Sequence, residues 1–160
     1  MQTVRKPLSE LKLDERNTRL HDRRNIEMIK ASLQEFGQYR PFVVDQDMII
    51  RVGNGMYVAM QELGMTEGDC SILQLTPEQA MALSVVDNRA AELSKWDEVK
   101  LAQVITDLGD EKTTVGFNEK EITDILNKVE LDKIDMPDDS EPETPLTACP
   151  DCGFEWREKR

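Results

Sequence analysis

The 160-residue sequence predicts an α+β fold in which a small mixed sheet packs against helices. Short apolar runs alternate with longer segments whose apolar residues recur every three or four positions, as they do on one face of a helix. Helix-capping sequences stand at residues 76–79, 94–97 and 118–121. From about residue 130, prolines and acidic residues replace large apolar ones, which predicts a flexible linker.

Residues 4–13 form the first expected extended stretch, with Pro7 inside it. Residues 16–22 are polar and are expected to form a loop. A helix should follow, with Asp22 as its N-cap and Gly37 just past its end, where a left-handed backbone is wanted. The apolar face of this helix comprises Ile26, Ile29, Leu33 and Phe36.

Residues 41–44 and 48–52 are expected to pair as a hairpin around a turn at residues 45–47. The run Gly53-Asn54-Gly55 ends the second of these strands. A helix over residues 56–63 should follow and end at Gly64, and residues 69–75 are a third strand candidate.

Three further helices are expected. The first starts at Thr76 and runs to Asp87 or Asn88, the second starts at the capping box of residues 94–97 and ends at Gly109, and the third runs from residue 118 to about residue 129. The expected organisation is a core over residues 1–76, a helical extension packed on it over 77–129, an acidic linker over 130–147 and a cysteine knuckle over 148–160.

The formal net charge is −12, which argues against a protein that coats DNA non-specifically, because such binding depends on neutralising phosphates. Residues 1–40 nevertheless hold nine Lys or Arg against six Asp or Glu. This excess is either without meaning or the basis of one phosphate-binding face. No apolar run is long enough to span a membrane and no signal peptide is visible, so we expect a cytoplasmic protein.

Two segments are candidate phosphate contacts. A strand, the turn Gly53-Asn54-Gly55 and then a helix would present free backbone N–H groups to an anion; the alternative is a tight turn that needs positive φ. Asn17 and Arg19 lie in an arginine-rich loop, and arginine suits phosphate oxygens; the alternative is a solvated polar loop.

A third candidate is Asp87-Asn88-Arg89, at or beyond the end of a helix. Its side chains could hold other loops, bind a ligand or simply cap the helix. No catalytic set stands out, because His21 is the one histidine of the chain and the carboxylates have no telling spacing.

Cys149 and Cys152 form a Cys-Pro-x-Cys-Gly knuckle, which is half of a tetrahedral four-cysteine zinc site. Two chains would then share one zinc ion, which predicts a homodimer. The alternatives are a redox pair, a disulfide or a disordered tail. Cys70 lies in an expected strand and is interpreted as a small buried apolar residue.

The order of these motifs resembles the ParB/sulfiredoxin-like domain over about residues 4–129. The motifs are residues 8–11 (LSEL), 17–19 (NTR), 29–38 (IKASLQEFGQ), 41–44 (PFVV), 50–56 (IRVGNGM) and 59–64 (AMQELG). Residues 87–97 (DNRAAELSKWD) are similar to an extension found in ParB-like proteins of phages and mobile elements, and residues 116–117 also match.

The resemblance implies a pocket in which the glycine turn and the helix after it hold the phosphates of CTP or ATP. Carried over, the binding residues are Gly53, Asn54 and Gly55, with Asn17 and Arg19 from the other side. Relatives include DNA-partition CTPases, a sulfinic-acid reductase, proteins described as nucleases and domains fused to DNA methyltransferases.

Two positions depart from the relatives. Met56 stands where partition proteins and sulfiredoxins carry Arg, and Arg51 or Arg89 are the candidates to supply the missing charge. The turn also lacks the cysteine that the reductase needs, so sulfiredoxin activity is not expected.

The prediction is a ParB-like accessory protein in DNA transactions of a mobile element. It would bind a nucleotide or a nucleic-acid phosphate, with DNA or a DNA-modifying enzyme as partner. The alternatives are a nuclease or nucleotidase (CTPase or ATPase) of low activity, and a protein-interaction module whose nucleotide pocket has decayed.

Overall fold

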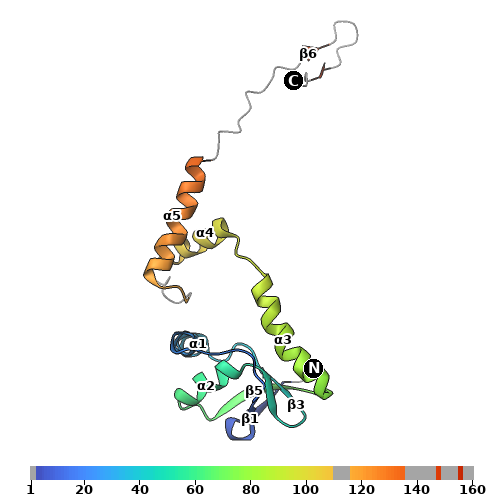
Figure 1. Cartoon of the computed structure of the whole chain (residues 1–160). Coiled ribbons are helices and arrows are strands. Elements are labelled where there is room, and N and C mark those ends of the chain that lie inside the picture. Colours follow the sequence, from blue (N-terminus) through green and yellow to red (C-terminus); the bar gives the residue numbers. More distant parts are fainter. Residues whose placement is uncertain (1–2, 110–115, 136–146, 149–154, 157–160) are drawn as a thin grey trace.

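The computed structural model describes residues 3–109, 116–135, 147–148 and 155–156, with side chains as far as Val129. Its main feature is a five-stranded mixed sheet in the order β1-β5-β3-β4-β2, with helices packed against it (Figure 1). The expected α+β class is therefore confirmed.

The sheet is built from short strands, whose bounds are β1 Thr3–Pro7, β2 Lys12–Leu13, β3 Phe42–Asp45, β4 Ile49–Val52 and β5 Glu67–Leu73. The predicted hairpin is present, because β3 pairs antiparallel with β4, with an irregularity between Val43 and Val44. β3 and β5 run parallel, as do β2 and β4, while β1 and β5 are antiparallel. The expected extended stretch at residues 4–13 is interrupted by a 3₁₀ turn, η1 (Leu8–Glu10).

Helices α1 (Arg23–Phe36) and α2 (Asn54–Glu62) pack together and enclose the core of the sheet domain. The predicted caps of α1 are confirmed: the Asp22 carboxylate accepts a hydrogen bond from the Asn25 amide, and Gly37 has a φ of 67°. Phe36, expected on the apolar face, is instead 61% exposed. The core side chains with the least exposure are Phe42, Val44, Ile50, Ala59, Met60 and Cys70.

Helix α3 (Pro77–Leu93) begins at the predicted Thr76–Gln79 capping box but continues past its expected end. Asp87, Asn88 and Arg89 thus lie inside a helix and not at its end, so the expected position is corrected. The chain has no Gly or Pro here to stop the helix. α3 packs on β4 and then runs away from the sheet towards α4 (Figure 1).

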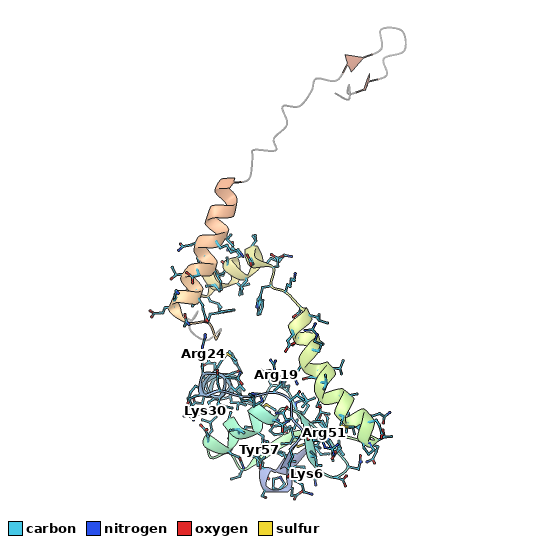
Figure 2. All side chains as sticks on the ribbon, in the orientation of Figure 1. Lys6, Arg19, Arg24, Lys30, Arg51 and Tyr57 are labelled. Atoms are coloured by element: carbon cyan, nitrogen blue, oxygen red, sulfur yellow. The ribbon has the colours of Figure 1, made fainter. Side chains whose placement is uncertain are left out.

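Helices α4 (Glu98–Leu108) and α5 (Glu119–Asp135) pack against each other. Asp97 alone caps α4, whereas Ser94 belongs to the end of α3, so the predicted box at residues 94–97 is corrected. α5 opens with reciprocal hydrogen bonds between Asn118 and Glu121, and it extends into the expected linker as far as Asp135. Arg24 on α1 points towards α5 and pairs with Glu121 at 2.5 Å (Figure 2).

Two short strands follow in the C-terminal part, β6 (Thr147–Ala148) and β7 (Glu155–Trp156), which pair antiparallel. Cys149 and Cys152 lie outside the described residues. Within the described part of the chain, no helix combines the length and the apolar character needed to cross a bilayer.

Candidate functional site

The glycine turn joins β4 to α2 through a backbone that only glycine adopts readily. Gly53 has a φ of 108°, and a Cβ atom at this position would lie 2.9 Å from Cδ1 of Phe42. α2 begins at Asn54, two residues earlier than expected, so the backbone N–H groups of the turn form the helix N-terminus. The tight-turn interpretation and the anion interpretation are both compatible with this geometry.

Gly55 is needed for a different reason. A Cβ atom there would lie 2.7 Å from Cε1 of His21, so the imidazole lies directly against the turn. The Nδ1 atom of His21 is 2.7 Å from Oδ1 of Asn25, which holds the ring beside α1.

The Asn-x-Arg loop is closed by Asn17 itself. The Asn17 side chain accepts a hydrogen bond from the Arg19 amide and donates one to the Arg19 carbonyl, each at 3.2 Å. The Arg19 guanidinium leaves the loop and pairs with Glu92 on α3 at 2.5 Å. Both of these side chains are almost half exposed.

The loop and the turn meet at one cavity of about 80 Å³. It is lined by residues from the Asn-x-Arg loop, α1, the α1–β3 loop, β4, the turn, α2 and α3: Asn17, Arg19, His21, Ile29, Arg40, Val52, Gly53, Asn54, Gly55, Met56, Asp87 and Asn88. Asn17, Arg19, Gly53, Asn54 and Gly55 are therefore brought together. Arg89 is not among the lining residues, and it pairs with Glu92 at 3.2 Å on the exposed side of α3.

The Asn54 side chain is occupied by structural hydrogen bonds. Its Oδ1 accepts from the Asp14 amide at 3.2 Å, and its Nδ2 donates to the Ile50 carbonyl at 3.1 Å. The side chain is buried, so Asn54 can serve a ligand through its backbone only. Met56, at the position of the relatives' Arg, is 5% exposed and belongs to the hydrophobic core.

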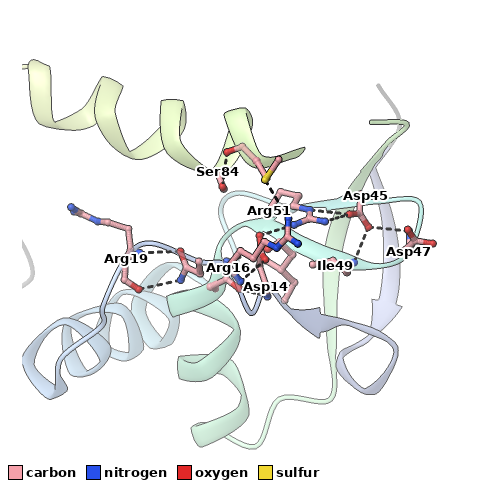
Figure 3. A network of polar contacts seen from close by, with 12 residues as sticks. Asp14, Arg16, Arg19, Asp45, Asp47, Ile49, Arg51 and Ser84 are labelled. Atoms are coloured by element: carbon pink, nitrogen blue, oxygen red, sulfur yellow. Dashed lines mark hydrogen bonds and ion pairs between the residues drawn. The ribbon is translucent and has the colours of Figure 1, made fainter. Parts of the chain in front are cut away.

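Arg51 is held between two carboxylates on the other side of the sheet, below α3 (Figure 3). Its Nη1 donates to Asp14 at 2.7 Å and its Nη2 to Asp45 at 2.6 Å. The three side chains are 12%, 5% and 3% exposed, respectively. Because both carboxylates face it and it does not line the cavity, Arg51 cannot supply the missing charge of the turn.

This network shifts the ionisation of its members. Burial opposes the charged form of Asp45, but hydrogen bonds from the Ile49 amide, from Arg51 and from the Asp47 amide outweigh it and lower the pKa of Asp45. Burial likewise opposes the charge of Arg51, and the two carboxylates outweigh it and raise its pKa. Both groups are therefore charged at neutral pH.

Sequence reasoning missed two polar lining residues, Arg40 and, as a site residue, His21. Arg40 precedes Pro41 in a loop without a motif, so no local pattern marks it. Asp87 and Asn88 do line the cavity, although from within α3, and Asn88 also donates to the Ser84 carbonyl at 2.7 Å.

No group of three or more His, Cys, Asp or Glu in the part of the chain with described side chains could hold a metal ion. Cys70 is fully buried, as expected, and burial raises the pKa of its thiol. An enclosed thiol with a raised pKa is a poor nucleophile.

No family model matches this chain, and no curated protein matches it. Among solved structures, it is similar to the C-terminally truncated chromosome-partitioning protein ParB from Caulobacter crescentus complexed with CTP-gamma-S. That likeness has a TM-score of 0.68 and 14% identity, over 81% of this chain and 79% of that chain.

Two further likenesses are weaker. Sulfiredoxin from Arabidopsis thaliana has a TM-score of 0.45 and 23% identity, over 52% of this chain and 97% of that chain. A Pnob8-like ParB-N domain has a TM-score of 0.48 and 17% identity, over 96% of this chain and 56% of that chain. The likeness to the Caulobacter protein shows that the chain has a ParB-like fold, as the sequence motifs predict.

Proposed function

We propose that this protein binds a phosphate group of a nucleotide or a nucleic acid at the cavity between the Asn-x-Arg loop and the glycine turn. The observation that carries the proposal is the meeting of Asn17, Arg19, Gly53 and Gly55 at the N-terminus of α2. Unpaired backbone N–H groups and the helix dipole both favour an anion at such a position.

The similar ParB structure was solved with CTP-gamma-S, which supports a nucleotide as the ligand. On this basis the protein is a ParB-like accessory protein in DNA transactions. The mobile-element setting rests on the resemblance of residues 87–97, and a DNA-modifying partner rests on the relatives that are fused to DNA methyltransferases.

Calorimetric titration of the full chain with CTP, ATP and a short DNA duplex tests the proposal. We expect saturable binding of at least one of these, weakened in the variant Arg19→Ala. Random-sequence duplex at physiological salt should not be coated, because the net charge is −12. Absence of binding to all three ligands would rule out the phosphate site.

A further inference from the structure

A phosphate group that leaves water for a protein cavity is usually paired with a cationic side chain. This cavity lacks the Arg that the relatives carry in the turn. Position 56 is a Met whose side chain lies in the core. Arg51 is held by Asp14 and Asp45 away from the cavity, and Arg89 pairs with Glu92 outside it. The charge must therefore come from another side chain.

Arg19 lines the cavity, but it shares its charge with a carboxylate of α3. Its guanidinium is 2.5 Å from a carboxylate oxygen of Glu92, and Asp87 adds a further negative charge to the lining. His21 also lines the cavity, and its Nδ1 atom lies 2.7 Å from Oδ1 of Asn25. Arg19, Glu92 and Asp87 together bring no net positive charge to the cavity.

Arg40 supplies the positive charge that the other lining side chains do not provide. It lines the same cavity, its side chain is exposed, and no acidic residue in the described part of the chain lies within ion-pair distance of it. Its position is fixed by the end of α1 at Phe36 on one side and by the start of β3 at Phe42 on the other. A guanidinium is suited to grip two phosphate oxygens at once.

We propose that Arg40 is the phosphate-binding cation of this site, in the role that the Arg of the turn has in the relatives. This inference rests on the proposed function and names the residue that gives it affinity. The cavity of about 80 Å³ also limits the ligand. Sites that enclose a drug-sized molecule measure about 300–1,000 Å³, so this cavity has room for a phosphate group and not for a whole nucleotide.

The test is calorimetric titration of the full chain with inorganic phosphate and with CTP, in the wild type, in Arg40→Gln and in the matched control Arg89→Gln. A charge-assisted hydrogen bond contributes about 1.5–3 kcal/mol, so Arg40→Gln should weaken both ligands about tenfold or more. Arg89→Gln should bind within about twofold of the wild type, because Arg89 does not line the cavity. Inorganic phosphate should also compete with CTP.

The outcomes distinguish the proposed function from the role of Arg40. A wild type that binds no phosphate ligand overturns the proposed function and this inference together. A wild type that binds while Arg40→Gln binds equally well overturns the role of Arg40 and leaves the proposed function standing. Thermal unfolding of Arg40→Gln checks that this exposed substitution leaves the fold intact.

Discussion

Asp45 makes its hydrogen bonds within a few residues of the chain, but one of its partners, Arg51, connects it to Asp14. Its carboxylate accepts hydrogen bonds from the Asp47 and Ile49 amides and from Arg51, which also reaches Asp14 (Figure 3). Without the Asp45 charge, Arg51 loses its charge-assisted hydrogen bonds to this carboxylate and keeps Asp14 as its remaining carboxylate partner.

We expect Asp45→Asn to lower the free energy of unfolding by about 2 kcal/mol at pH 7, measured by urea denaturation, because hydrogen bonds to a charged group are weakened while Arg51 stays paired with Asp14. Asp47→Asn is the matched control, because only the backbone amide of Asp47 joins the network, and it should change stability by less than about 0.5 kcal/mol. Equal losses in the two variants would contradict the role of the Asp45 charge.

The same carboxylate predicts a pH dependence. The pKa of Asp45 is lowered in the folded protein, so the unfolded chain takes up the proton first. Its stabilising contribution is complete above the ordinary Asp pKa of about 3.9 and is lost as the pH falls through the lower folded value. Asp45→Asn should therefore lose less stability than the wild type on acidification below about pH 4. Parallel curves of unfolding free energy against pH for the two proteins would contradict this contribution of Asp45.

Gly53 combines two requirements that can be separated by mutation. In Gly53→Ala, the new Cβ atom would sit on a backbone with a φ of 108° and would lie 2.9 Å from the Phe42 ring. In Gly64→Ala, the backbone has a φ of 71° and the new Cβ atom would meet no atom within 4 Å. We expect the control to cost about 1 kcal/mol and Gly53→Ala clearly more, by chemical denaturation. Equal costs would show that the Phe42 ring moves aside freely.

At the scale of elements, the N-terminus of α4 is capped by Asp97 and not by Ser94. The Asp97 carboxylate accepts a hydrogen bond from the Lys100 amide, while the Ser94 hydroxyl donates a hydrogen bond to the Ala91 carbonyl in α3. Asp97→Ala should destabilise α4 by about 1 kcal/mol and speed hydrogen exchange of its first amides, and Ser94→Ala should leave those amides unchanged. Fraying of α4 in Ser94→Ala would contradict this start.

Elements with local signals could be predicted from the sequence. Asp22 and Gly37 mark both ends of α1, and the glycine turn marks the start of α2 to within two residues. The continuation of α3 could not be seen, because Asp87 and Asn88 are weak helix formers that this helix nevertheless tolerates.

Only those residues of the candidate site that lie in a sequence motif could be predicted. Asn17, Arg19 and the turn stand in recognisable strings, whereas Arg40 is set by the spatial meeting of the α1–β3 loop with the turn. The ion pair between Arg51 and Asp14 joins residues 37 positions apart in the chain, which no local sequence pattern reveals. Met48, with a φ of 61°, likewise occupies a turn position where glycine or asparagine is usual.

At the scale of the whole molecule, the shared zinc site remains a prediction of the sequence. We expect about half a zinc ion per chain by elemental analysis, because two knuckles would complete four thiolate ligands. The double variant Cys149→Ser/Cys152→Ser should contain none. Cys70→Ser is the control and should keep its zinc, since Cys70 is buried in the sheet domain. Zinc that persists in the double variant would contradict the knuckle.

The side chain of Asn54 has a consequence for how fast and at what entropic cost a ligand could associate. It ties the turn to β4 through Ile50 and to the preceding loop through Asp14, which in turn holds Arg51. The backbone of the turn is thus ordered when the chain folds. An arriving anion therefore meets a preorganised surface, so little conformational entropy is lost on binding and the encounter need not wait for a segment to fold.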